Sequence, residues 1–232
     1  MRILPKKANE SARRVHRLAK PRNATRYLEV GVARGETFFA VDLPHKVAVD
    51  PHLQFDYAAL ETETTRYHNI TSDDYFLNHA KGAEFDVIFL DGLHTFEQTF
   101  RDFCASFAHA HRKTVWMIDD TVPVDVYSAM PDLDDSLRFR TDSRTTHKSW
   151  HGDVYKIVFA LHDFFPSMSY ATANDGENAQ TIVWFEPRAG FKPLFNSLEP
   201  ISRLSYFDFR KNEAVMKYDR ESAIMERVAA AK

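Results

Sequence analysis

Short apolar runs alternate with longer mixed segments along the first half of the chain. The runs that predict strands cover residues 26–30, 46–49, 66–70, 86–90 and 114–118, and the segments between them are candidate helices. Strands that alternate with helices are typical of a parallel sheet covered on both faces, because each right-handed crossover returns to the same sheet. The pattern therefore predicts a doubly wound α/β fold.

The clearest helix follows the fourth run. Its apolar stripe repeats at steps of four, three and four residues, through Phe96, Phe100, Phe103 and Phe107. This is the spacing of one helical face. Thr95 and Gln98 have the spacing of a capping box at its start. We expect the stripe to pack on the sheet as core rather than to hold a cofactor, and we expect Cys104 to be packed there too.

The second half begins with a polar stretch over 119–149, which is long for a loop without structure of its own. We interpret it as a substrate-side loop with some helix. Residues 152–163 and about 219–230 predict helices, while 168–173 and 181–185 predict strands joined by an Asp-Gly turn within 174–178, which is a hairpin signal. The prediction is a mostly parallel, seven-stranded, Rossmann-like sheet with a C-terminal antiparallel hairpin.

The length of 232 residues fits one sizeable α/β domain. We find no internal repeat and no low-complexity segment that would mark a second one. We therefore expect a single domain over 1–232, made of an N-terminal helical extension (1–24), a core (25–186) and a C-terminal extension (187–232).

Composition narrows the class of protein. Hydrophobic residues make up 44% of the chain and charged residues 27%, and no apolar run approaches the roughly 20 residues that cross a bilayer. Residues 1–7 lack the apolar core and cleavage site of a secretory signal. We therefore expect no membrane association and a cytoplasmic location. The aromatic residues at 206–209 could bury against a partner, so a homo-oligomer is one alternative.

The net charge of −3 gives no general attraction to nucleic acid. Basic residues do gather near the start of the chain. We expect them to form a solvated helix face rather than a nucleic-acid site: Lys6, Lys7, Arg13, Arg14, Arg17, Lys20, Arg22 and Arg26.

Two glycines follow the first predicted strand in the spacing G-x-x-x-G, at Gly31 and Gly35. The dinucleotide fingerprint needs three glycines to cradle a pyrophosphate. The turn therefore favours a ligand without one. Glu29 comes just before it, and a buried carboxylate needs a ligand ammonium or backbone donors nearby.

Asp50 ends the second predicted strand, 15 residues beyond Gly35. A carboxylate there is placed to accept hydrogen bonds from two ribose hydroxyls. The alternative is that Asp50 only caps the turn at Pro51. Together with the glycine turn, ribose binding is the favoured interpretation.

Acidic residues also end the fourth and fifth predicted strands, as Asp91, Asp119 and Asp120. The carboxyl ends of parallel strands meet at one edge, so these carboxylates should converge and repel one another unless a cation intervenes. A hard ion such as Mg²⁺ suits such a cluster, and a metal-free acidic pocket is the alternative. His94 is a candidate general base oriented by Asp91, or else a structural loop histidine.

Four segments together resemble the class I methyltransferases of the methyltransferase domain 24 type, over about residues 25–186: YLEVGVARGETFF, VAVDP, FDVIFLDGLHTFEQ and WHGDVYK. The resemblance implies S-adenosylmethionine as cofactor and an O-methyl acceptor, often a sugar or other natural product. It implies cofactor contacts at Glu29, Gly31, Asp50 and the turn with Ser72 and Asp73. Our full expected set of cofactor contacts adds Gly35 and Asp91.

The interval of 28 residues from Asp91 to Asp119 is also similar to that between metal-binding acids of catechol-type and macrolide-sugar O-methyltransferases. The leading hypothesis is an S-adenosylmethionine-dependent O-methyltransferase in which His94, assisted by Asp91, takes the acceptor proton. A nicotinamide-dependent oxidoreductase is disfavoured by the missing third glycine and by the hairpin. A non-catalytic methyltransferase-like scaffold is the third hypothesis.

Overall fold

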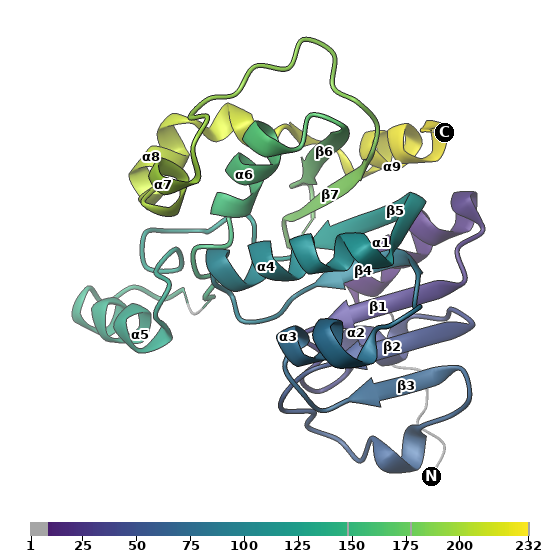
Figure 1. The fold of residues 1–232 in the computed structure, drawn as a ribbon. Helices are drawn as coiled ribbons and strands as arrows, with labels where there is room; N and C mark the ends of the chain where they lie inside the picture. Colours follow the sequence, from purple (N-terminus) through teal and green to yellow (C-terminus); the bar gives the residue numbers. More distant parts are fainter. Residues whose placement is uncertain (1–8, 148, 177, 232) are drawn as a thin grey trace.

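A computed structural model describes residues 9–147, 149–176 and 178–231, which form one mixed sheet with helices on both faces (Figure 1). Lys6 and Lys7 of the predicted basic segment and residue 177 of the predicted turn lie outside these ranges. The sheet has the order β3-β2-β1-β4-β5-β7-β6-β8. Its strands are β1 (Arg26–Val30), β2 (His45–Val49), β3 (Thr65–His68), β4 (Phe85–Leu90), β5 (Ala110–Ile118), β6 (Met168–Ala173), β7 (Gln180–Phe185) and β8 (Tyr218–Asp219).

The seven predicted strands are all present, and the expected mostly parallel sheet with an antiparallel hairpin is confirmed. Strands β3, β2, β1, β4 and β5 run parallel, whereas β7 is antiparallel to both β5 and β6. The two-residue β8, parallel to β6, is an addition that its short sequence does not signal.

The α-helices are α1 (Glu10–Ala19), α2 (Glu36–Ala40), α3 (Ser72–Asp74), α4 (Phe96–Ser106), α5 (Leu133–Asp142), α6 (Lys156–Phe164), α7 (Leu198–Ser202), α8 (Tyr206–Lys211) and α9 (Glu221–Ala230). Shorter 3-10 turns are η1 (Lys20–Arg22), η2 (Ala58–Leu60), η4 (Phe107–His109) and η5 (Glu213–Met216), and η3 (Tyr75–His79) is a π-turn. Helix α5 lies in the stretch interpreted as a loop with some helix, which is confirmed. The helix predicted from residue 152 begins only at Lys156, because residues 152–155 form a turn in which Gly152 has a φ of +59°.

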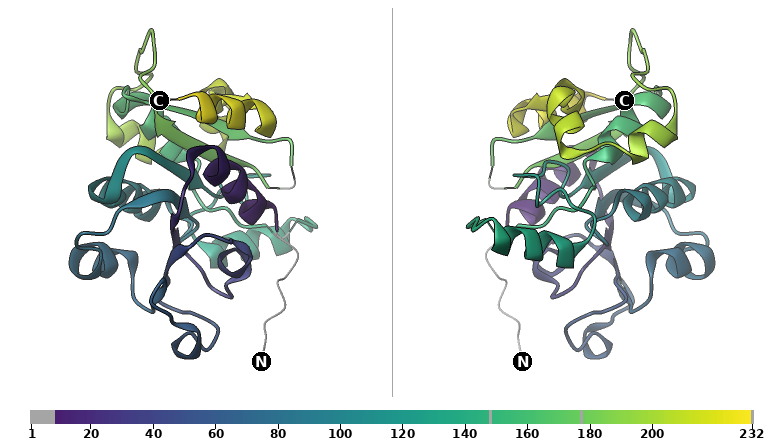
Figure 2. Two further views of the ribbon diagram at one scale, coloured as in Figure 1. Left: turned by 90° about the vertical axis from the view of Figure 1, so that its right-hand side faces the viewer. Right: turned by 90° about the vertical axis from the view of Figure 1, so that its left-hand side faces the viewer.

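Apolar residues of the strands point alternately to two cores, one on each face of the sheet. Helices α1, α2 and α9 cover one core, and α4, α6 and α8 cover the other. Figure 2 shows α1 and α9 on one side of the sheet and α4 on the other. Phe96 and Phe103 of the predicted stripe are buried on α4, with Phe100 and Phe107 packed beside them, so the core role of this stripe is confirmed.

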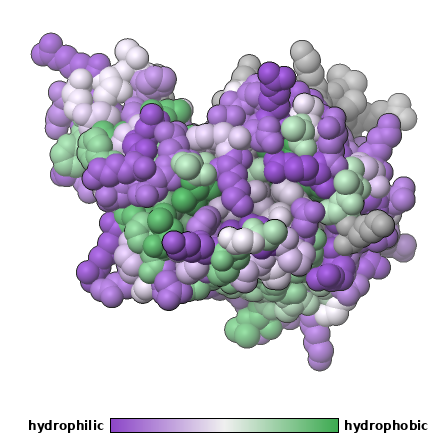
Figure 3. Space-filling model, turned by 90° about the horizontal axis from the view of Figure 1, so that it is seen from above, coloured by the Kyte–Doolittle hydropathy of each residue, from purple (hydrophilic) through white to green (hydrophobic). Residues whose placement is uncertain are grey.

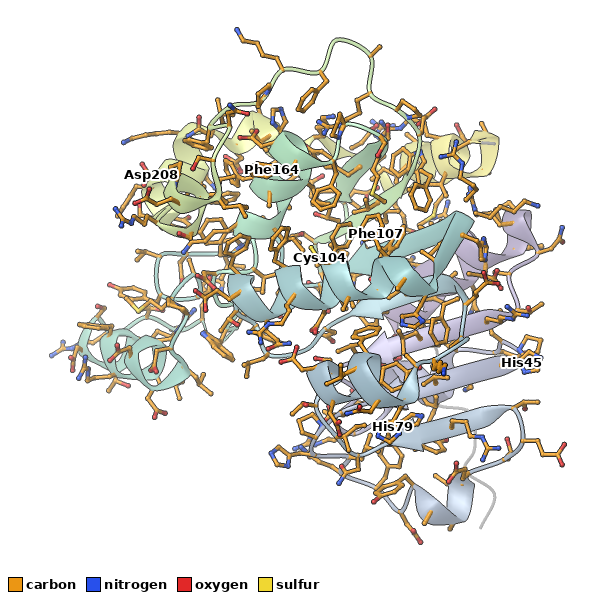
Figure 4. All side chains as sticks on the ribbon, in the orientation of Figure 1. His45, His79, Cys104, Phe107, Phe164 and Asp208 are labelled. Carbon is orange, nitrogen blue, oxygen red and sulfur yellow. The ribbon has the colours of Figure 1, made fainter. Side chains whose placement is uncertain are left out.

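Cys104, which we expected in the core, is instead exposed on α4 (Figure 4). It follows Phe103 by one residue, and a helix turns by about 100° per residue, so it leaves the buried face.

The expected solvated face of basic residues is wrong for Arg14. Its side chain is fully buried and donates hydrogen bonds to Glu221, to the carbonyl of Asn178 and to Gln180. Arg14 therefore ties α1 to α9 and to the start of β7, because a buried guanidinium must have its donors paired.

The C-terminal extension forms α7 to α9 and packs on the core. Phe209, one of the aromatic residues that left a homo-oligomer open, is fully buried within this chain, whereas Phe207 is exposed. Seen from above, the molecule is largely hydrophilic with separate hydrophobic patches (Figure 3). No helix among the described residues is long and apolar enough to cross a membrane.

Candidate active site

A cavity of about 740 Å³ lies at the carboxyl ends of β1, β2, β4 and β5. This is where ligands of open α/β sheets bind, and the volume is ample for one small ligand. Predicted residues line it at both ends: Gly31, Asp50, Ser72, Asp73, Asp91, His94, Asp119 and Asp120. Glu29 and Gly35, the other two predicted residues, are not part of its described lining.

The turn after β1 is tight because Gly31 lies against the end of β4. Gly31 has a φ of +89°, and a β-carbon there would stand 1.8 Å from the backbone oxygen of Asp91. Only glycine permits both the left-handed backbone and this approach. Gly35 also has a positive φ, but it begins α2 and faces the ring of Phe39. Gly31 therefore shapes the cavity directly and Gly35 only shapes the turn.

Asp50 both caps a turn and faces the cavity. Its Oδ2 accepts a hydrogen bond from the backbone N–H of Ala33 at 2.8 Å, and its Oδ1 accepts one from that of His52 at 2.6 Å. Each carboxylate oxygen can accept a further bond. The carboxylate is therefore held rigidly, with one acceptor site on each oxygen that no described residue fills. The two interpretations of Asp50 are compatible.

Glu29 lies beneath the cavity on the face of β1 that α1 and α2 cover. Its Oε2 accepts a hydrogen bond of 2.6 Å from the hydroxyl of Tyr27. Burial, with a further contribution from Asp91, raises the pKa of Glu29 to about 8. The donor next to Glu29 is therefore a tyrosine of the same strand, and the carboxyl is mostly neutral at pH 7.

The carboxyl ends of β4 and β5 bring an imidazole between two carboxylates. His94 Nδ1 lies 2.9 Å from Asp120 Oδ2, and His94 Nε2 lies 3.5 Å from Asp91 Oδ1. The expected neighbourhood of Asp91 and His94 is present, and Asp120 approaches the imidazole more closely than Asp91 does.

The backbone of this cluster is strained. His94 has a φ of +29° and Asp120 a φ of +56°, in the left-handed region that few residues with a β-carbon adopt. A β-carbon on Gly152 would stand 1.6 Å from the carbonyl oxygen of His94, and the ring of Trp150 stacks on the imidazole at 5.1 Å. The loop before α6 therefore packs against His94 and fixes its position.

Charge at this cluster is concentrated and buried. Burial by itself would lower the pKa of His94, but hydrogen bonds to Asp120 and Asp91 outweigh it and raise the pKa to about 11. Burial raises the pKa of Asp91 to about 6, with the charge of Asp120 adding to the effect. At neutral pH His94 is therefore an imidazolium held between two carboxylates.

Asp119, which we grouped with Asp91 and Asp120, turns toward the other side of β5. Its Oδ1 accepts hydrogen bonds from the side-chain amides of Asn178 and Gln180 at 2.7 and 3.2 Å. Gln180 also accepts a bond from Arg14, so this carboxylate is connected to α1. Burial, then the charges of Asp91 and Asp120, raise the pKa of Asp119 well above its usual range.

The ligand atoms that converge are those of Asp91, His94 and Asp120, which lie within 4.8 Å of one another. This donor set differs from the predicted one, because His94 takes the place of Asp119. Two carboxylates and an imidazole fit a divalent ion that accepts nitrogen as well as oxygen ligands, provided that the imidazole gives up its proton.

The cavity also has lining residues to which sequence reasoning gave no role in the site or only a minor one: Gln98, Asp102, Trp150, His151 and Asn178. His151 Nε2 lies 3.6 Å from Asp120 Oδ1, and its buried Nδ1 has no hydrogen-bond partner in the described part of the chain.

Thr95 caps α4 as predicted, but the Gln98 side chain turns to Ser72 and Asp102 instead of completing the capping box. The sequence offered one signal for these lining residues, which was that Gln98 is a polar residue on the helix bordering the site.

Residues 25–121 match the model of a methyltransferase domain family. No curated protein matches the chain.

Solved structures with the same fold include methyltransferases. The O-methyltransferase TomG of Streptomyces achromogenes, solved with SAM and involved in tomaymycin synthesis, has a TM-score of 0.51 at 14% identity, over 78% of this chain and 82% of its own. A putative caffeoyl-CoA O-methyltransferase of Staphylococcus aureus has a TM-score of 0.52 at 13% identity, over 78% and 86%. At these identities the likeness shows the fold, which is that of class I methyltransferases.

Proposed function

We propose that the protein is an S-adenosylmethionine-dependent O-methyltransferase, because residues 25–121 match the model of a methyltransferase domain family. The proposed acceptor is a hydroxyl group of a small molecule or a sugar. One observation carries the proposal: a single cavity joins the Gly31 turn and Asp50 to the cluster of Asp91, His94 and Asp120. TomG, together with two proteins of the same fold that are described as putative O-methyltransferases, supports the oxygen acceptor.

Residues at the carboxyl ends of β1 to β4 would hold the cofactor in the cavity. The free acceptor sites of Asp50 receive the two ribose hydroxyls, since its carboxylate is already fixed by two backbone N–H groups. The Gly31 turn lets the backbone approach a chain that carries no phosphate. The turn with Ser72 and Asp73 lies on the far side of Asp50 and lines the same cavity.

The acceptor hydroxyl lies against Asp91, His94 and Asp120. The bound cofactor would supply the methyl group: the acceptor oxygen would bond to the methyl carbon as the sulfur–carbon bond breaks, and the electron pair would return to sulfur. Holding the oxygen in line with the methyl group provides much of the rate gain. The hydroxyl proton must pass to a group of the cluster during this step.

The sequence suggested His94 as that group. Because His94 is protonated and both of its nitrogens face carboxylates, we assign it first the role of a cation that stabilises the oxygen as it loses its proton. The carboxylate of Asp91, with its pKa raised to about 6, takes the proton. A base is most effective when its pKa lies near the working pH.

A divalent metal is the second form of the same proposal. Asp91, His94 and Asp120 would hold it, and the ion would supply a positive charge that lowers the pKa of the acceptor hydroxyl. The ion competes with the proton of His94, so metal affinity should rise with pH. Full activity in the presence of a chelator would exclude this form and leave the imidazolium as the cation.

The test of the function begins with calorimetry of S-adenosylhomocysteine binding, followed by methyl transfer to a panel of phenolic, sugar and carboxylate acceptors. We expect binding in the micromolar range and transfer to a hydroxyl. Stabilisation by NAD but not by S-adenosylhomocysteine in a thermal shift assay would favour an oxidoreductase. Binding without transfer to any acceptor of the panel would favour the non-catalytic scaffold.

A further inference from the structure

The wall of the cavity nearest β3 contains a buried carboxylate, Asp102, that the proposed chemistry does not use. Asp102 lies on α4 with only 2% of its surface exposed, and it lines the cavity. A carboxylate so far from water must be compensated by donors. The hydrogen-bond donors around Asp102 therefore indicate whether its carboxylate is fully paired within the protein or needs a further donor from a ligand.

The hydrogen-bond partners of Asp102 in the described part of the chain are neutral. Its Oδ1 accepts a bond of 2.9 Å from the Gln98 amide, which also donates to the Ser72 hydroxyl at 3.2 Å. Burial raises the pKa of Asp102 to about 6 despite these bonds. The carboxylate is thus incompletely compensated, and a further donor from a ligand would stabilise its charged form.

Asp73, the acid that the family resemblance implied for the cofactor, has a different environment. Its side chain is 46% exposed and forms an ion pair with Arg101 at 3.0 Å. Arg101, which precedes Asp102 on α4, therefore pairs with Asp73 at the surface. Asp102 is the better candidate for binding a neutral donor inside the cavity.

The order of the strands decides which part of the cofactor reaches Asp102. Asp50 follows β2, the reacting cluster follows β4 and β5, and the Ser72 turn follows β3 on the opposite side of Asp50. If the ribose is at Asp50 and the sulfonium points to the cluster, the base must extend toward Ser72, Gln98 and Asp102.

On the basis of the proposed function, we propose that Asp102, held by Gln98 and Ser72, recognises the exocyclic 6-amino group of the cofactor's adenine. The amine donates a hydrogen bond to the carboxylate. A 6-oxo purine presents lone pairs to the same carboxylate and is rejected. Asp102 is therefore the residue that selects adenine over hypoxanthine.

Calorimetry with two ligands on the intact protein tests this assignment. S-adenosylhomocysteine carries the 6-amino group, and S-inosylhomocysteine carries a 6-oxo group in its place. We expect the wild type to prefer the first by about 10- to 150-fold, the contribution of one charge-assisted hydrogen bond. In Asp102→Asn the amide can donate to the 6-oxo group, so the preference should fall to within about 3-fold or reverse.

Asp74→Asn is the matched control, because it changes the same chemistry outside the cavity lining. Asp73→Asn tests the competing acid of the lining. Both variants should keep the wild-type preference. Equal binding of both ligands by the wild type, or loss of the preference in Asp73→Asn, would overturn the role of Asp102 even if Asp102→Asn failed to fold. No binding of S-adenosylhomocysteine by the wild type would instead overturn the proposed function. The two failures are therefore distinguishable.

Discussion

The two ends of the cavity use carboxylates in opposite ways. At the end that we call the binding end, formed by Asp50, Ser72, Gln98 and Asp102, the carboxylates are surrounded by backbone N–H groups, an amide and a hydroxyl. At the reacting end, formed by Asp91, His94 and Asp120, the carboxylates surround a cationic imidazole on strained backbone.

The difference indicates a division of labour. Neutral donors leave carboxylates free to accept hydrogen bonds from hydroxyl and amino groups, which suits recognition of a nucleoside. Carboxylates packed around an imidazole hold a proton or a metal ion at a fixed position, which suits a catalytic site. Changes at the reacting end should therefore affect turnover, and changes at the binding end should affect affinity.

The largest expected effect is that of His94→Gln on turnover. Losing the cation beside the acceptor oxygen should lower kcat by about 10²- to 10⁴-fold. The affinity for S-adenosylhomocysteine should change by less than about 3-fold. Steady-state kinetics and calorimetry measure the two quantities. His79→Gln, at an exposed position outside the cavity lining, is the control, and an equal loss of affinity and turnover in His94→Gln would contradict the division.

Asp50→Asn should show the reverse. Two charge-assisted hydrogen bonds to the ribose are weakened, so the affinity for S-adenosylhomocysteine should fall by about 10- to 150-fold. Turnover at saturating cofactor should fall much less. Asp56→Asn changes an exposed aspartate nearby and should leave affinity unchanged. Unaltered binding in Asp50→Asn would show that Asp50 only caps its turn.

Asp120→Asn probes how the reacting end holds its proton. Removing the closest carboxylate should lower the pKa of His94 by about 1 to 3, because an anion beside an imidazole stabilises its protonated form. Histidine resonances followed by NMR against pH report this value. Asp119→Asn removes a carboxylate that bonds to Asn178 and Gln180 instead, so there the pKa of His94 should move less. Equal shifts in both variants would show that only the total charge matters.

Glu29, which lies outside the cavity lining, should have the smallest effect on affinity and turnover, and its change should appear in stability instead. The folded chain keeps the Glu29 proton up to a pKa of about 8, whereas the unfolded chain loses it near 4.5. This group's contribution to stability is therefore present below about pH 4.5, falls as the pH rises, and is lost above about 8. The loss is at most roughly 1.4 kcal/mol per pH unit. Glu29→Gln should remove this loss in urea unfolding at pH 5 and pH 8.5.

Glu29→Asp, which keeps the ionisable group, is the control and should keep a pH-dependent loss. The prediction is contradicted if the free energy of unfolding changes equally in the wild type and in Glu29→Gln between pH 5 and pH 8.5. That result would show that the Glu29 carboxyl is ionised in the folded protein.

Much of this protein followed from the sequence alone. Alternation of apolar runs predicted the strands, and the Asp-Gly turn between two of them predicted the hairpin, because both signals are local. The positions of Asp50 and Asp91 at strand ends placed them at one rim, since parallel strands bring their carboxyl ends together. The need for glycine at position 31 was also visible, although not the backbone of Asp91 that makes it necessary.

Tertiary structure decided which of these groups meet. Arg14 and Glu221 are more than 200 residues apart, and only folding shows that they form a buried pair. Asp119 and Asp120 are neighbours in the chain, yet the positive φ of Asp120 sends one carboxylate to His94 and leaves the other with Gln180. Asp102 looked like one more polar residue of a helix. The sequence determined where carboxylates stand along the chain, and packing determined the partners of each one, because burial and partners set the charge of a carboxyl group.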